Sequence, residues 1–123
     1  MFASPIDPGA LLARSYPVAD GVRVRLRLAR PRDAGGLAAL LARAGVAADD
    51  LELRRALTFD PRRRAVIAAL GPAGAGESLM ALGGIDLGAA APDLLLAEGP
   101  PELRELLEEA LVARARMRGP RVA

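Results

Sequence analysis

The stretch DGVRVRLRLARPRDAGGLAALLARAG, residues 20–45, decides the fold class because its periodicity changes halfway. In its first half, Val22, Val24, Leu26 and Leu28 alternate with arginines. A period of two places apolar side chains on one face of a strand and charged side chains on the other. We therefore expect a half-buried strand in this half of the stretch.

The second half predicts a helix that follows the strand directly. Pro31 ends the strand, and Asp33 has a side chain suited to a helix N-cap. The apolar residues then recur at helical spacing, at Leu37, Leu40, Leu41 and Ala44. Gly45 is placed to end the helix.

A second helix is predicted in DDLELRRAL, residues 49–57. Asp49 is its expected cap, and Glu52 stands at the third helical position, as in a capping box. Asp60 and Pro61 follow its end.

Three strands are predicted next. Residues 64–70 and 78–87 are apolar, and the glycine-rich connection between them indicates an antiparallel hairpin pair. A short apolar run at residues 93–97 predicts a strand in a central position, in a sheet covered on both faces.

The last predicted element is a helix from Glu102 to about Arg118. Its apolar stripe is made by Leu103, Leu106, Leu107, Ala110 and Leu111. Four glutamates precede Arg114, Arg116 and Arg118, an order that complements the helix dipole.

Composition limits the available chemistry. The 123 residues include no cysteine and no histidine, which excludes thiol and imidazole nucleophiles, Cys/His metal sites and disulfides. The net charge is only +2 and the three aromatic residues are too few for a base-stacking platform, so nucleic acid is not an expected partner.

The location of the protein is predicted from what the chain lacks. The longest uncharged stretch, residues 65–76, is shorter than the roughly 18 apolar residues of a membrane span. The N-terminus has no basic segment followed by an apolar run, so it does not resemble a secretory signal. We expect a cytoplasmic protein that does not associate with membranes. Residues 1–20, which hold three prolines, are predicted to form a peripheral N-terminal arm with one helical turn near residues 10–14.

Residues 20–45 resemble the opening of the GNAT acetyltransferase superfamily, where a strand broken at an arginine-proline or similar pair precedes an aspartate that caps the first helix. LLEEALVARARMRG, residues 106–119, resembles the part of the family's third helix that follows its coenzyme loop. ESLMALGGIDL, residues 77–87, resembles the family's third strand, and the order of elements agrees over residues 20–119.

The resemblance implies an α/β (α+β) fold, with a mixed, mainly antiparallel sheet flanked by helices and truncated after the third helix. It divides the chain into the arm, residues 1–20, and a GNAT-like domain, residues 21–123. In the family, acyl-CoA binds at the end of the fourth strand, and backbone N–H groups of a glycine-rich loop hold its pyrophosphate. If the protein is active, acetyl-CoA is therefore the implied cofactor. The implied cofactor-binding residues are Leu96, Ala97, Gly99 and Arg104.

The segment that matches the coenzyme loop departs from the family pattern. AEGPPELRE, residues 97–105, has one glycine before the helix, and Pro100 and Pro101 have no N–H to donate. Its three glutamates place negative charge where a diphosphate would sit. We interpret the loop as degenerate. The alternative is that GPPE is simply a favourable helix start, with proline at the first position and glutamate in the first turn.

Catalytic candidates are few. Glu98 and Asp86 stand near the ends of predicted strands, and either could act as a general base if burial raised its pKa. For both carboxylates the alternative is a solvated or capping role. The family often uses a tyrosine as general acid, whereas Tyr16, the one tyrosine of this chain, lies in the predicted arm.

Three functions remain open. The first is a non-catalytic, regulatory or dimerising GNAT-like module, in which an unpaired strand edge is satisfied by a second copy in a homodimer. The second is an active acetyl-CoA-dependent N-acetyltransferase acting on a small amine or a protein amine. The third is contact with an acidic partner through Arg23, Arg25 and Arg27 or through Arg62, Arg63 and Arg64, although a solvated sheet face and a basic turn account for both groups.

Overall fold

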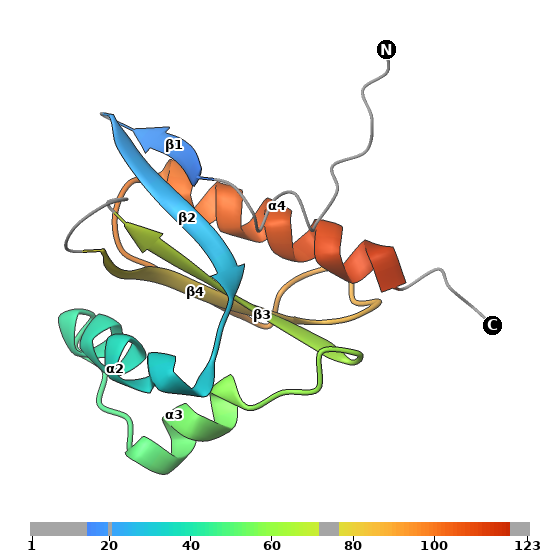
Figure 1. The fold of residues 1–123 in the computed structure, drawn as a ribbon, viewed down its shortest axis with the longest axis horizontal. Helices are drawn as coiled ribbons and strands as arrows, with labels where there is room; N and C mark the ends of the chain where they lie inside the picture. Colours follow the sequence, from blue (N-terminus) through green and yellow to red (C-terminus); the bar gives the residue numbers. More distant parts are fainter. Residues whose placement is uncertain (1–14, 20, 72–76, 119–123) are drawn as a thin grey trace.

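The computed structural model describes residues 15–19, 21–71 and 77–118, with side chains described up to residue 116. Figure 1 shows one antiparallel sheet between helices. The strands are β1 (Ser15–Ala19), β2 (Val22–Leu28), β3 (Arg64–Gly71), β4 (Ser78–Asp86) and β5 (Leu94–Ala97). The helices are the short 3₁₀ turn η1 (Pro31–Asp33) and the α-helices α2 (Ala34–Arg43), α3 (Asp50–Leu57) and α4 (Pro101–Arg118).

The sheet has the simple order β1-β2-β3-β4-β5, and every pair of neighbouring strands is antiparallel. The prediction of a mainly antiparallel sheet flanked by helices is confirmed at this level. Strand β1 was not predicted, and it lies within the range assigned to the N-terminal arm. The predicted helical turn at residues 10–14 and most of the connection between β3 and β4 lie outside the described residues.

The sheet is covered on both faces. Helix α4 lies across one face, and α2 and α3 lie across the other (Figure 1). Under α4 the core includes Val24, Leu26, Ile67, Leu107 and Leu111. Under α2 and α3 the core includes Leu37, Leu40, Leu57, Val66 and Leu82. Each face therefore has its own apolar layer, and alternate residues of β3 supply both.

The helix boundaries follow local chemistry. Gly45, with φ +78°, ends α2; its N–H bonds to the Ala42 carbonyl at 3.0 Å, and the N–H of Val46 bonds to the Leu41 carbonyl at 2.9 Å. These two bonds form a Schellman motif. The Asp49 side chain accepts a hydrogen bond from the Glu52 N–H at 2.8 Å, so the predicted cap of α3 is confirmed.

Asp33 stands at the N-cap position of α2 but does not cap it with its side chain. Its carboxylate instead accepts hydrogen bonds from the Arg30 N–H and from the Arg27 guanidinium. The intervening 3₁₀ turn η1 explains the difference, because it turns the Asp33 side chain back toward β2.

Strand β4 contains a bulge at Met80. Ala69 pairs with Ala81 but the next residue, Leu70, pairs with Leu79, so Met80 is an extra residue on β4. As a result Leu79 packs in the layer under α2, whereas Ala81 packs in the layer under α4.

The predicted strand at residues 93–97 is present, but its predicted central position is wrong. Among the described strands, β5 pairs only with β4 and forms one edge of the sheet. Its leucines are half-buried because helices lie on both faces. An apolar run indicates covered faces; it carries no information about whether both strand edges are paired.

Candidate functional site

A cavity of about 380 Å³ lies where the end of α2, strand β5 and the start of α4 meet. Its floor is apolar, and its rim carries two arginines and one glutamate. The lining residues are Leu40, Leu41, Arg43, Ala44, Leu95, Leu96, Ala97, Glu98 and Arg104. The structure thus brings together four of the six residues predicted for a site: Leu96, Ala97, Glu98 and Arg104.

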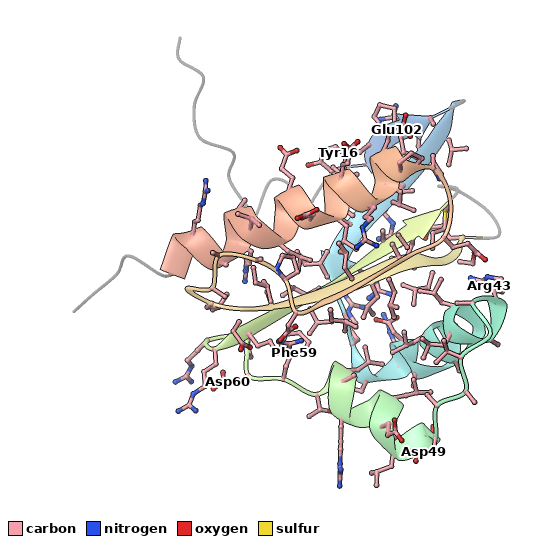
Figure 2. The ribbon with its side chains drawn as sticks, turned by 180° about the vertical axis from the view of Figure 1, so that it is seen from behind. Tyr16, Arg43, Asp49, Phe59, Asp60 and Glu102 are labelled. Atoms are coloured by element: carbon pink, nitrogen blue, oxygen red, sulfur yellow. The ribbon has the colours of Figure 1, made fainter. Side chains whose placement is uncertain are left out.

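An ion pair crosses the rim of this cavity. Nε of Arg43 lies 2.6 Å from Oε1 of Glu98, and Nη2 of Arg43 donates to the Leu79 carbonyl at 3.1 Å. Arg43 is the last residue of α2, where Figure 2 labels it, so its side chain can reach the sheet edge. Glu98 is 45% exposed and already paired with a guanidinium, so it lacks the burial on which its predicted role as general base depended.

The turn between β5 and α4 is shaped by glycine and proline. Gly99 adopts φ +131°, a conformation that side chains other than glycine rarely accept. Pro101 opens α4, and the Leu103 N–H bonds to the Pro100 carbonyl at 3.0 Å. Neither proline has an N–H, and Glu102 stands at the start of the helix (Figure 2). The turn therefore offers fewer amide donors than a glycine-rich loop of the same length.

Arg104 is the remaining cation of the cavity. It is exposed, and none of the described carboxylates forms an ion pair with it. Arg104 is therefore available to an anionic ligand, whereas Arg43 is already paired with Glu98.

The outer edge of β5 presents backbone hydrogen-bonding groups. The Glu98 N–H donates to the Met80 carbonyl at 2.9 Å, in register with the β4–β5 pairing. Because hydrogen-bonded pairs alternate in antiparallel strands, Leu94 and Leu96 also face β4 through their backbones. The N–H and C=O groups of Leu95 and Ala97 then point away from β4.

Asp86 lies elsewhere. Because β4 and β5 are antiparallel, Asp86 and Glu98 belong to opposite ends of this strand pair. Asp86 accepts from Nη1 of Arg64 at 2.9 Å, and Asp93 accepts from both terminal nitrogens of Arg64 at 2.9 and 2.8 Å. The hydrogen bond from Arg64 lowers the pKa of Asp93. The structure gives Asp86 a salt-bridging environment and does not bring it to the cavity.

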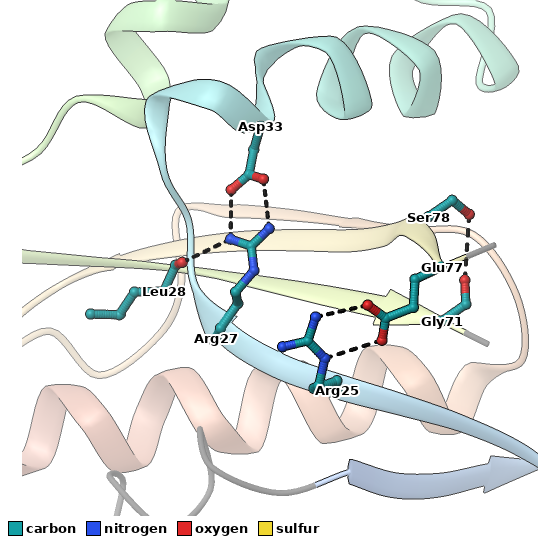
Figure 3. A network of polar contacts seen from close by, with 7 residues as sticks. All are labelled: Arg25, Arg27, Leu28, Asp33, Gly71, Glu77 and Ser78. Atoms are coloured by element: carbon teal, nitrogen blue, oxygen red, sulfur yellow. Dashed lines mark hydrogen bonds and ion pairs between the residues drawn. The ribbon is translucent and has the colours of Figure 1, made fainter. Parts of the chain in front are cut away.

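The arginine face of β2 is also largely paired (Figure 3). Nε and Nη2 of Arg25 donate to the Glu77 carboxylate at 3.1 and 2.7 Å, and the terminal nitrogens of Arg27 donate to Asp33 at 2.8 and 2.7 Å. The hydrogen bond from Arg25 lowers the pKa of Glu77. Two of the three β2 arginines that were considered as contacts for an acidic partner are therefore already paired within the chain.

Asp33 is the least exposed acid in these ion pairs, with 10% of its side chain accessible. Burial by itself would raise its pKa, but the hydrogen bonds from Arg27 and from the Arg30 N–H outweigh that effect, so the pKa of Asp33 lies below its usual value. The Arg27–Asp33 ion pair joins β2 to the start of α2, and we interpret it as a contact that stabilises the fold.

Neither a metal centre nor a membrane span is found in the part of the chain that the structure describes. In that part, His, Cys, Asp and Glu side chains form no group of three or more that could hold a metal ion. No helix within the same residues has both the length and the apolar character required to cross a bilayer.

Arg43 was not predicted as a site residue, and Arg64 was considered only as a contact for an acidic partner, yet the two residues hold the two ends of β5. Both stand next to the boundary of an element, Arg43 at the end of α2 and Arg64 at the start of β3. No local pattern signals their partners, because Arg43 and Glu98 are 55 positions apart and Arg64 and Asp93 are 29 apart. Tyr16 lies on β1, at the other edge of the sheet from β5, and does not line the cavity.

Comparison with known proteins returned no family model that matches the chain, and no match among curated proteins or solved structures.

Proposed function

We propose that this protein is a GNAT-like module that does not catalyse acetyl transfer and that acts by associating with a second copy of itself. The proposal rests on the resemblance of residues 20–119 to the GNAT superfamily and on the chemistry around the cavity beside β5. A regulatory or dimerising role follows if the fold is retained while coenzyme binding is lost.

The observation that carries the proposal is the turn Glu98–Pro101. A diphosphate held at a helix N-terminus needs several convergent backbone N–H groups. Here Pro100 and Pro101 supply none, and Glu98 is tied to Arg43 at 2.6 Å. Glu102 and Glu105, at the start of α4, place further negative charge beside the turn, and Arg104 offsets part of it.

A second candidate function is acetyl-CoA-dependent N-acetyl transfer to a small amine or a protein amine. The observation that favours it is the cavity of about 380 Å³ beside β5, with Arg104 on its rim. Leu95 and Ala97, whose backbone groups point away from β4, both line this cavity, so an extended ligand could bond to them. This candidate needs a general base other than the paired Glu98, or an amine that arrives deprotonated.

Coenzyme binding separates the two candidates. The melting temperature is measured with acetyl-CoA from micromolar to 5 mM, and heat of binding is measured by titration calorimetry. The non-catalytic module predicts no shift and no heat. If the enzyme is active, coenzyme at about 100 times its Kd stabilises the fold by about 2.7 kcal/mol, which raises the melting temperature by several degrees.

The Arg104→Ala variant is the matched control for site occupancy. If a shift occurs and Arg104→Ala removes it, the coenzyme binds in the cavity beside β5 and the non-catalytic proposal is wrong. Activity is then tested directly by incubating the protein with acetyl-CoA and a panel of amines and measuring the free CoA that is released.

A further inference from the structure

The two edges of the described sheet are not equivalent. Strand β1 carries Pro17, and its pairing with β2 shifts register between Pro17 and Ala19. Proline and irregular pairing are both features that protect an edge strand against further pairing. Strand β5 has no proline, and its four residues pair with β4 in one continuous register. Of the two edges of the described sheet, the β5 edge is the one that lacks both of these protective features.

We propose that two copies of this chain associate through β5, which pairs antiparallel with β5 of the other copy about a two-fold axis at Leu96. The inference rests on the proposed function, which needs a second copy, and it names the surface and the register. Because a two-fold interface uses the same patch twice, the edge must be complementary to itself.

The hydrogen-bonding pattern meets this condition. With Leu96 on the axis, Leu95 of each copy is opposite Ala97 of the other. These are the two residues of β5 whose N–H and C=O groups point away from β4. Each Leu95–Ala97 pair exchanges two hydrogen bonds, so the outward groups of both strands are all satisfied.

The neighbouring register is less favourable. An axis at Leu95 would leave Ala97 opposite Asp93 of the other copy. The N–H of Asp93 already donates to the Gly84 carbonyl at 3.1 Å, so Asp93 cannot complete the pair. The register centred on Leu96 is therefore the one that uses every outward group of β5.

Charge supports the same register. With Leu96 on the axis, Glu98 is opposite Leu94 and Asp93 is opposite Gly99, so no two carboxylates face each other directly. Glu98 keeps Arg43 at 2.6 Å, and Asp93 keeps Arg64 at 2.8 Å. Each end of the paired strands then brings together two acids and two arginines, a balanced group with complementary charges.

The apolar side chains at the edge would gain burial on pairing. Leu94, Leu95 and Leu96 are all half-buried in the single chain. At the axis the two Leu96 residues form a non-hydrogen-bonded pair, whose side chains approach closely. Because the edge has only four residues, the expected dimer is weak and its population depends on protein concentration.

Cysteine cross-linking tests the register, because the natural chain has no cysteine. In Leu96→Cys the two thiols meet at a Cα separation of about 4.5 Å, within the range of a disulfide. In the matched control Leu94→Cys, on the same face, the two thiols lie about 13 Å apart along the strands and cannot bond. Each variant is oxidised at 10 and 200 μM and examined by non-reducing electrophoresis.

We expect Leu96→Cys to form mostly covalent dimer at the higher concentration and Leu94→Cys to remain at least fivefold less cross-linked. Equal cross-linking of the two variants, or preferential cross-linking of Leu95→Cys, would overturn the register. Absence of dimer from both variants, together with a monomeric natural chain in sedimentation at 200 μM, would overturn the interface.

A backbone variant gives independent evidence. Ala97→Pro removes an outward N–H without removing a bond to β4, and Ala97→Thr retains that N–H. We expect Ala97→Pro to weaken dimerisation at least tenfold in sedimentation equilibrium while its circular dichroism spectrum is unchanged, and Ala97→Thr to dimerise normally. Equal dimerisation of the two folded variants would contradict pairing through β5.

The two proposals fail in different experiments. A dimer that forms without cross-linking at Leu96 leaves the non-catalytic module intact and rejects the β5 interface. Because coenzyme and the second copy would use the same outward groups of Leu95 and Ala97, coenzyme that binds and suppresses cross-linking at Leu96 leaves the interface intact and rejects the non-catalytic module.

Discussion

Arg43 and Glu98 join the end of α2 to the end of β5 through a 2.6 Å ion pair, although 55 positions separate them in the chain. The pair closes one side of the cavity beside β5. The pair also cancels the charge of Glu98 before any ligand arrives. Arg104 is then the remaining charged residue of the cavity lining.

This ion pair is expected to contribute little to the free energy of unfolding. Both side chains are more than 40% exposed, and exposed ion pairs contribute about 0–1 kcal/mol. A double-mutant cycle of Arg43→Ala and Glu98→Ala in urea unfolding should give a coupling free energy below about 1 kcal/mol. A coupling above about 2 kcal/mol would show that the pair holds α2 against the sheet.

The pair between Arg27 and Asp33 should contribute more, because the two side chains are only 17% and 10% exposed. Asp33→Asn leaves the Arg27 guanidinium without its counter-charge in a partly buried position. We expect a loss of about 1–3 kcal/mol in the free energy of unfolding at pH 7. Asp50→Asn, which breaks an exposed pair within α3, is the control and should cost less than about 0.5 kcal/mol. Equal losses from the two variants would contradict this ranking.

The same pair predicts a pH dependence. The pKa of Asp33 is lower in the folded protein than in the unfolded chain, so its stabilisation is present above the unfolded value of about 4. It is lost as the pH falls through the lower, folded pKa. The difference in unfolding free energy between the natural chain and Asp33→Asn should therefore shrink between pH 5 and pH 2. A difference that stays constant over this range would show that the charge of Asp33 is not responsible.

Gly83 should be the glycine least tolerant of a side chain in the sheet under α4. A Cβ built at Gly83 lies 2.5 Å from Cδ1 of the fully buried Leu111 and 3.2 Å from the Leu94 carbonyl. We expect Gly83→Ala to destabilise the fold by about 1–3 kcal/mol. Gly35→Ala, in α2 with no atom within 4 Å of its Cβ, should be neutral or stabilise by up to about 1 kcal/mol. Thermal and urea unfolding of both variants measure the contrast.

Amide hydrogen exchange can test the direction of the β5 backbone. In dilute solution the N–H groups of Leu96 and Glu98, which face β4, should exchange slowly. The outward N–H groups of Leu95 and Ala97 should exchange at least tenfold faster than these. The reverse order would mean that the β4–β5 register is different from the one described here.

Periodicity made most of the fold predictable. The alternation in VRVRLRL gave β2, and the apolar stripe from Leu103 to Leu111 gave α4, because both elements bury one face of an otherwise charged segment. Asp49 and Gly45 gave boundaries, since each carries a specific local hydrogen-bonding or backbone requirement. Strand β1 was not predicted, because its five residues include a proline and are too few to show a clear alternation of apolar and polar side chains.

The site was only partly predictable. Leu96, Ala97 and Arg104 were expected from the resemblance to the GNAT coenzyme site, and Glu98 was expected as a candidate base. All four line one cavity because they lie close together along the chain from β5 into α4. Arg43 and Arg64 reach β5 from other elements, and the edge position of β5 depends on which strands lie beside it. Both facts belong to tertiary structure, and no local residue pattern encodes them.

One extra residue sets the geometry of this whole corner of the molecule. The Met80 bulge orients two successive carbonyls of β4: that of Leu79 toward Arg43, and that of Met80 toward the Glu98 N–H. A deletion of residue 80 would leave a regular β3–β4 ladder, in which Leu79 keeps its place under α2 and one carbonyl has to replace the two that now accept from Arg43 and Glu98. Relatives of this protein that keep the corner should tolerate insertions and deletions in their loops but preserve the residue count between Leu79 and Ala81.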